Sequence, residues 1–318
     1  MRKDTLMRNS SPANNPETIV EYFLQYFLQS SPAFAKKVAE LHGERPELFT
    51  GLAAKMLAWA ESSLGEAYPE RLVRGYEYFV TEVNRAQLEY EKSGHYRYSR
   101  FDEVEKRAYA SQEFMEKYHW GVFISTFAWR HHLEIYEFFK RDFLSHPAFD
   151  KQGTLLDLGC GSGVWTFLTL SSIAGWDGVG VDISPTSVAW AEKTGAESNL
   201  RCDFRLADAT AFTASQPFQA GISCFLLEHL ERPTELLSSL ARNLEPGAPA
   251  FVTGAVTAAE VDHIYEFKRE SELVAMAEEC GFVVEKMLSA SPSPFPRTRK
   301  FKPRSVALIL TRKTGEHW

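Results

Sequence analysis

Apolar positions three and four residues apart run through the first half of the chain. After Pro16 they fall at Ile19, Val20, Phe23, Tyr26 and Phe27. This spacing is typical of an amphipathic helix that begins at the proline. The same periodicity predicts further helices over Ala33–His42, Glu47–Ser62, Pro69–Lys92 and, as one long helix, from about Ser111 to Phe143. Residues 1–150 are therefore expected to form an all-helical cap domain.

The second half alternates between short apolar runs and helical patterns. Seven runs are candidate strands: Thr154–Leu158, Gly178–Val181, Phe204–Leu206, Gly221–Phe225, Ala250–Thr253, Val283–Leu288 and Val306–Thr311. Helical patterns lie between most of them, over Val164–Ile173, Pro185–Glu197, Pro233–Asn243 and Glu270–Cys280. Such alternation predicts an α/β, doubly wound (Rossmann-like) sheet of seven mostly parallel strands over residues 151–318. A proline-rich loop joins the last two runs, which predicts a closing antiparallel pair.

The composition narrows the classes of partner. The chain has 318 residues and a net charge of −7. Binding to nucleic acid needs clustered Lys and Arg side chains. Because the net charge is negative, no nucleic-acid partner is expected. No apolar run approaches the roughly 18 residues that span a bilayer, so no membrane association is expected either. The four cysteines, Cys160, Cys202, Cys224 and Cys280, show no Cys-x-x-Cys spacing. The absence of such a spacing predicts that there is no metal site. It also predicts that the cysteines are reduced thiols in a cytoplasm.

A glycine loop follows the first predicted strand. It reads Asp157-Leu158-Gly159-Cys160-Gly161-Ser162-Gly163-Val164, and a helical pattern begins directly after it. Ligands of open α/β sheets bind at the carboxyl ends of the strands. A dinucleotide fingerprint would need glycine where Val164 stands, and the loop lacks the Lys of a P-loop. The spacing therefore favours a ligand without a pyrophosphate. Asp157 could meet a cationic group of that ligand or fix the loop.

Two more acids end the second and third predicted strands. Asp182 could accept the hydroxyls of a ribose, or it could support the helix start at Ser184 and Pro185. Asp208 could accept from the amine of an adenine, or it could be a turn residue. The three acids Asp157, Asp182 and Asp208 are expected to border one cavity at the rim of the sheet.

These motifs resemble those of the class I S-adenosylmethionine-dependent methyltransferases, in their small-molecule branch. The resemblance covers residues 150–290 and rests on Leu156–Gly163, Val181-Asp182-Ile183-Ser184 and Ala207-Asp208-Ala209. It extends to Leu227-Glu228-His229-Leu230 and Leu244-Glu245-Pro246-Gly247. It implies S-adenosylmethionine as cofactor and S-adenosylhomocysteine as product. The cofactor-binding residues that it implies, with Tyr118 from the helical half, are Asp157, Gly159, Gly161, Gly163, Asp182, Ile183, Asp208, Ala209, Leu226 and Tyr118.

Some positions depart from the family pattern. The branch usually has an acid where Gln219 stands and a second glycine where Ala248 stands. Family members that modify base amines or glutamine amides carry Asn/Asp-Pro-Pro-Tyr/Phe after the fourth strand. Here that place reads Phe225-Leu226-Leu227-Glu228, which disfavours a nucleic-acid substrate.

Aromatic residues form a stripe on the predicted long helix, at Phe114, Tyr118, Phe123, Phe127 and Phe138. A stripe at helical spacing is typical of core packing, and part of it could also roof a ligand pocket. The segment Phe114–Tyr118 resembles the one that many small-molecule methyltransferases lay near the cofactor's sulfonium. An aromatic face attracts such a cation. Trp129 and Tyr265 are expected to contact the substrate.

Methyl transfer from a sulfonium is an in-line displacement that needs accurate positioning and a dry site. A general base is needed only if the acceptor must lose a proton. The candidates for that base are His263, then His229, then His132.

The sequence thus predicts methyl transfer to a small organic molecule, such as an amino acid, a phenol or a natural-product scaffold, at an O, N, C or S atom. A homodimer through the helical cap is also predicted. Two other classes stay open: an NAD(P)-dependent oxidoreductase, and a protein that binds S-adenosylmethionine without catalysis.

Overall fold

The computed structural model describes residues 15–104, 112–293 and 300–315. The side chains of residues 112–115 lie outside this description, and so does the predicted contribution of Phe114 to the aromatic stripe.

The first half of the chain is helical, as predicted. Its α-helices are α1 (Pro16–Ser30), α2 (Pro32–Glu44), α3 (Pro46–Leu64), α4 (Tyr68–Ser93), α5 (Phe101–Val104), α6 (Gln112–Ala128) and α7 (Arg130–Phe138). Shorter helical turns are η2 (Gly65–Ala67), η4 (Phe139–Phe143) and η5 (Pro147–Asp150). Helices α1 to α4 each have a proline in their first turn, where its missing N–H costs no hydrogen bond. Together these elements are called the helical half.

The predicted long helix from Ser111 to Phe143 is wrong as a single element. It breaks at Trp129, whose backbone is extended at φ −102° and ψ 130°, and α7 begins at the next residue. The Trp129 indole N–H donates to the Tyr76 hydroxyl at 3.1 Å, and its ring stacks on Phe79. These contacts with α4 hold the break, and η4 then widens the end of the helix into a π-helical turn.

The second half forms the predicted sheet of seven strands. They are β1 (Gly153–Leu158), β2 (Trp176–Asp182), β3 (Cys202–Leu206), β4 (Ala220–Ser223), β5 (Pro249–Val256), β6 (Phe282–Ala290) and β7 (Arg304–Arg312). Their order is β3-β2-β1-β4-β5-β7-β6, and all neighbours are parallel except β7, which runs antiparallel to β5 and β6. Helices α8 (Val164–Leu170), α9 (Pro185–Glu197), α10 (Pro233–Asn243) and α11 (Glu270–Glu279), with the turn η6 (Leu227–His229), complete this half.

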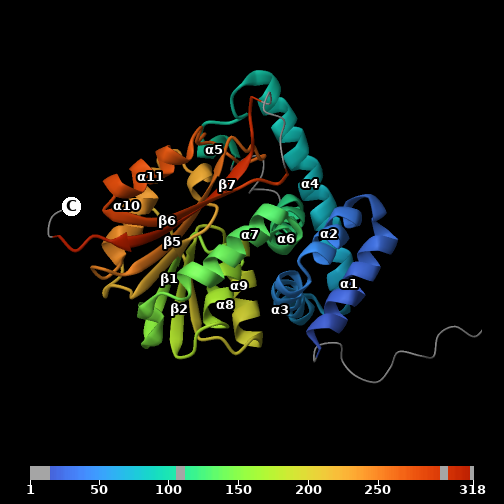
Figure 1. The fold of residues 1–318 in the computed structure, drawn as a ribbon, viewed down its shortest axis with the longest axis horizontal. Coiled ribbons are helices and arrows are strands. Elements are labelled where there is room, and N and C mark those ends of the chain that lie inside the picture. The colour runs from blue at the N-terminus through green and yellow to red at the C-terminus, as the bar shows by residue number, and fades with distance from the viewer. Residues whose placement is uncertain (1–14, 105–111, 294–299, 316–318) are drawn as a thin grey trace, which may run out of the picture.

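The two halves share one hydrophobic core. Figure 1 shows α6 and α7 lying between the N-terminal helices and the sheet. The ring of Phe139 in η4 lies 5.0 Å from Phe251 of β5 and 5.2 Å from Trp165 of α8, measured between ring centroids. Trp59 of α3 meets Phe167 of α8 at 5.4 Å. The core is therefore continuous across residue 150.

Helices α4 and α6 cross in close backbone contact at two glycines. A Cβ atom on Gly121 would lie 2.7 Å from the carbonyl oxygen of Gly75. A Cβ atom on Gly75 would lie 2.7 Å from the Cβ of Trp120. Only glycine permits this approach of the two backbones. The crossing therefore fixes the position of Tyr118, which lies one turn before Gly121 on α6. Among the described helices, none has the length and apolar character needed to cross a bilayer.

Candidate functional site

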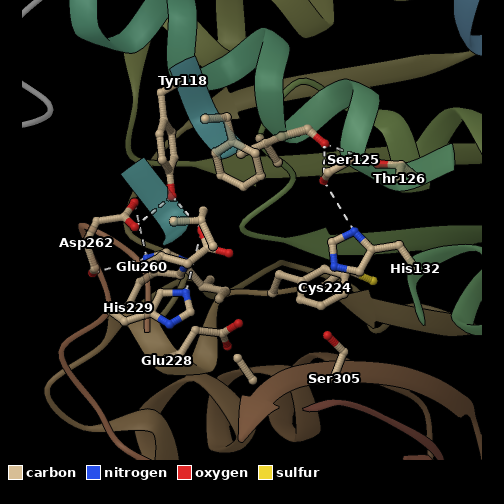
Figure 2. Close-up of a pocket in the computed structure, with 18 of the residues that line it drawn as sticks. Tyr118, Ser125, Thr126, His132, Cys224, Glu228, His229, Glu260, Asp262 and Ser305 are labelled. Carbon is tan, nitrogen blue, oxygen red and sulfur yellow. Dashed lines mark hydrogen bonds and ion pairs between the residues drawn. The ribbon is translucent and has the colours of Figure 1, made fainter. Parts of the chain in front are cut away.

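A cavity of about 1350 Å³ lies between the helical half and the carboxyl ends of β1 to β5. Its walls come from α2, α4, α6 and α7 on one side and from the loops after the strands on the other. Figure 2 shows the part of the cavity where polar side chains gather.

The glycine loop borders the cavity as predicted. Gly159 and Gly161 line it and have positive φ angles of 74° and 53°. A Cβ atom on Gly161 would have no neighbour within 4 Å, whereas one on Gly159 would collide with the side chain of Leu226. Gly163 is not among the described residues that line the cavity. It stands in the left-handed region, at φ 80°, directly before α8.

Asp157 lies beneath the loop and is only 2% exposed. Its carboxylate accepts a hydrogen bond from the Thr166 hydroxyl at 2.6 Å, which ties the end of β1 to α8. Burial raises the pKa of Asp157 to about 7. This acid fixes the start of the helix, and it also lines the cavity.

Asp182 joins two backbone segments at the end of β2. One carboxylate oxygen accepts from the N–H of Gly161 and the other from the N–H of Ser184, each at 2.8 Å. Burial raises the pKa of Asp182. The acid thus supports the start of α9, as one of the two sequence hypotheses held, and it borders the cavity as well. Each of its oxygens has a second lone pair for a ligand hydroxyl.

Asp208 is exposed at the end of β3, where it accepts from the backbone N–H and the hydroxyl of Thr210 at 2.8 and 2.7 Å. It is a turn residue in this sense, and it also lines the cavity together with Ala209 and Ile183. Ile183 leaves 57% of its surface exposed. All three predicted acids therefore border one cavity.

A polar cluster, most of it buried, lies on the other side of the cavity. It consists of Tyr118, Glu228, His229, Glu260, Asp262 and His263 and is called the acid–histidine cluster. All six residues line the cavity. Figure 2 shows the Tyr118 hydroxyl pointing at the carboxylates of Glu260 and Asp262, with His229 and Glu228 below them.

Tyr118 organises the two carboxyl groups after β5. Its hydroxyl oxygen lies 2.7 Å from Asp262 Oδ1 and 2.9 Å from Glu260 Oε2. Burial, together with the charge of Asp262, raises the pKa of Glu260 to about 8. The Tyr118 hydroxyl donates toward both carboxyl groups, and Asp262 Oδ1 is the nearer acceptor.

The two histidines of the cluster meet edge to face, with ring centroids 4.8 Å apart. His263 Nδ1 lies 2.7 Å from the carbonyl oxygen of Ala258, and burial beside His229 lowers the pKa of His263 to about 3. His229 Nδ1 lies 3.3 Å from the backbone carbonyl oxygen of Asp262 and 3.4 Å from its Oδ2. Burial would lower the pKa of His229, but the carboxylates of Asp262, Glu228 and Glu260 raise it overall.

Glu228 holds the cluster together through its backbone. Its carbonyl oxygen accepts from the N–H groups of Ile264 and Tyr265 at 2.8 and 3.0 Å. These bonds join η6 to the loop after β5. The side chain is only 1% exposed, and its Oε2 has no hydrogen-bond partner among the described residues. Sequence reasoning singled out neither Glu228 nor Glu260 as a site residue.

The other predicted contacts are His132, Trp129 and Tyr265. His132 lines the cavity, with Nδ1 3.3 Å from the Ser125 hydroxyl and its ring 4.8 Å from Phe225. Burial lowers the pKa of His132 to about 3. Trp129 also lines the cavity. Tyr265 is not among its described lining residues; its ring packs against Phe267, at a centroid distance of 4.7 Å.

Phe225 follows β4 at the cavity wall in a strained conformation. Its backbone φ angle is +55°, which lies in a region that residues other than glycine rarely adopt. Its N–H donates to the Thr253 hydroxyl at 2.8 Å, which holds the backbone in place. Strain of this kind is found where a wall of a ligand site must be held.

Comparison with known proteins finds similar sequences. Residues 155–247 match the sequence profile of a methyltransferase domain. The ubiquinone biosynthesis O-methyltransferase of Methylococcus capsulatus is 33% identical over 98 residues, which cover 30% of this chain and 40% of that protein. Its counterpart in Bordetella parapertussis is 26% identical over 182 residues, which cover 50% of this chain and 75% of that protein. The chain thus spans less than half of the first relative and three quarters of the second.

A solved structure shows the same fold. It is a protein of Galdieria sulphuraria described as a candidate sarcosine dimethylglycine methyltransferase. It superimposes with a TM-score of 0.50 and 15% identity, over 58% of this chain and 86% of that one. At this identity the likeness concerns the fold alone.

Proposed function

We propose that the chain transfers a methyl group from S-adenosylmethionine to a small organic molecule, because residues 155–247 match the profile of a methyltransferase domain and the motifs resemble those of the class I S-adenosylmethionine-dependent enzymes. The observation that carries this proposal is a single cavity bordered by two kinds of chemistry. The glycine loop and the three acids form one side, and the acid–histidine cluster forms the other.

The cavity is large enough for two molecules. Its volume of about 1350 Å³ exceeds the roughly 300–1,000 Å³ of an ordinary small-molecule pocket. A cofactor on the glycine-loop side therefore leaves room for an acceptor beside the cluster.

We assign the cofactor to the side of β1, β2 and β3. Gly159 and Gly161 leave room for its amino-acid part, next to Asp157. Asp182 has free lone pairs for the ribose hydroxyls. Asp208, with the flanking apolar side chains of Ile183 and Ala209, would meet the adenine, and Leu226 would pack beside it.

The acceptor is assigned to the side of α6, η6 and the loop after β5. There Trp129 supplies aromatic surface, and the cluster, which includes Tyr118, supplies polar contacts for the atom that is methylated. The contact of Tyr118 with the cofactor's sulfonium stays a prediction. General-base action by His263, His229 or His132 stays a prediction. An oxygen acceptor, as in the names of the relatives, is the first class to test.

The test begins with calorimetric titration of S-adenosylhomocysteine and of NADPH. We expect S-adenosylhomocysteine to bind and NADPH not to bind. Methyl-labelled S-adenosylmethionine is then mixed with panels of phenols, amines, amino acids and thioethers, and release of S-adenosylhomocysteine is measured.

Release with one acceptor class would support the proposal. Cofactor binding without release on any panel would indicate a non-catalytic binding protein instead, and binding of NADPH alone would indicate an oxidoreductase. The predicted homodimer is a separate matter, which sedimentation would decide. Tyr22 and Leu28, large apolar side chains exposed on α1, are the surface that we propose for it.

A further inference from the structure

We propose that Glu228, His229 and His263 form a binding site for a divalent transition-metal ion inside the cavity. One candidate ligand atom from each of the three side chains lies within 4.8 Å of the other two. Glu228 and His229 come from η6 after β4, and His263 comes from the loop after β5. The site itself is argued from these side chains and does not depend on methyl transfer.

Glu228 is the first reason. Its carboxyl group is buried at 1% exposure, and Oε2 has no hydrogen-bond partner among the described residues. A buried carboxylate oxygen without a hydrogen-bond partner is unfavourable, and proteins compensate buried carboxylates by pairing them or by metal coordination. A cation between Glu228 and the two imidazoles would provide that compensation.

The orientation of the histidines is the second reason. The Nδ1–H of His263 donates to the carbonyl oxygen of Ala258 at 2.7 Å. His229 Nδ1 faces the carbonyl oxygen of Asp262 at 3.3 Å. With Nδ1 used in this way, Nε2 is the nitrogen that each ring would offer to a metal ion. Histidine ligands of metals are generally held by such a bond from the other ring nitrogen.

The surroundings provide further oxygen atoms. Glu260, Asp262 and His263 form a second set whose candidate ligand atoms also lie within 4.8 Å of one another. The Tyr118 hydroxyl fixes both of these carboxyl groups. They could complete the coordination directly or through water.

Two imidazole nitrogens and a carboxylate favour Zn²⁺, Fe²⁺, Co²⁺ or Mn²⁺ over Mg²⁺ and Ca²⁺, which prefer oxygen ligands alone. A bound ion would polarise a hydroxyl or carboxylate of the acceptor, and this role rests on the proposed function. The sequence prediction of no metal site rested on cysteine spacing, which does not bear on a site built from His and Glu.

The test uses Co²⁺ as the probe. Full-length protein is stripped with a chelator and titrated with Co²⁺ alone, followed by calorimetry and by visible d–d absorption. We expect one equivalent to bind. Changes to groups that merely orient metal ligands already weaken affinity by about 10–100-fold. The ligand variants Glu228→Gln and His263→Ala should therefore lose at least that much.

The matched control is His146→Ala, since His146 does not line the cavity and should leave Co²⁺ affinity unchanged. Circular dichroism checks that each variant folds, and Glu228→Gln is expected to fold because it keeps the size and shape of the buried side chain. Absence of Co²⁺ binding to the parent protein would overturn the proposal. So would a Co²⁺ affinity of both ligand variants that equals the affinity of the parent. S-adenosylhomocysteine binding, measured on the same samples without metal, reports separately on the proposed function.

Discussion

Replacement of Asp157 by Asn removes a buried ionisable group and keeps an oxygen that can accept from Thr166. The carboxyl group is 2% exposed, and burial raises its pKa to about 7 from an ordinary 3.8. The folded chain therefore holds this proton over a pH range in which the unfolded chain has released it. We expect the variant to be more stable than the parent above neutral pH.

The sign and size follow from the two pKa values. Since the folded pKa is raised, the stability that the protonated group contributes is present below about pH 4 and is lost as the pH rises through about 7. Between about pH 5 and the folded pKa of about 7, the parent loses stability over roughly two pH units. Each unit is worth about 1.4 kcal/mol, and the loss is complete above about pH 8. The stability difference should therefore grow by about 3 kcal/mol in favour of Asp157→Asn.

Urea unfolding at these two pH values, without cofactor, measures the difference. Fluorescence and circular dichroism should give coincident transitions, so that a two-state free energy applies. Asp203→Asn is the control, because Asp203 is exposed on β3 and pairs with Arg205. A difference between Asp157→Asn and the parent that stays constant with pH would refute the reasoning.

Two other predictions concern the walls of the cavity. Asp182→Ala removes the acceptor of two backbone N–H groups and should lower the unfolding free energy by about 1–3 kcal/mol. Calorimetry should also show weaker S-adenosylhomocysteine binding, and an affinity as high as that of the control Asp203→Ala would speak against the ribose role. Gly121→Ala places a methyl group against the backbone of α4 and should cost about 1–3 kcal/mol in thermal unfolding. The control Gly51→Ala, with nothing within 4 Å of the new Cβ, should be neutral or stabilising. Equal melting temperatures for Gly121→Ala and Gly51→Ala would show that the helix crossing has room for a methyl group.

The sequence predicted the sheet and most helices because each of those elements is encoded locally. An apolar run bounded by glycine or an acid is sufficient for a buried parallel strand. The break at Trp129 was not predictable in this way, since apolar residues continue through it. Its cause is a tertiary contact, the hydrogen bond and stacking of Trp129 on α4.

The site was predictable on its cofactor side and much less so on the other. Asp157 lies near the end of β1, Asp182 ends β2 and Asp208 follows β3, so the topology alone brings them to one rim. The acid–histidine cluster depends on bonds from the loop after β5 to the backbone of Glu228, more than thirty residues away in the chain. Periodicity does not show which acids become buried by such a loop. Glu228 and Glu260 were missed for this reason.

The continuous core limits which changes of sequence this protein can accommodate. Rings that precede residue 150, such as Phe139, interleave with Phe251 and Trp165 beneath the sheet. A fragment that started at residue 151 would present those faces to water, so the two halves cannot be exchanged like modules. New acceptors would instead be accommodated by single substitutions along α4, α6 and α7, where a side chain reaches the cavity without taking part in the shared packing.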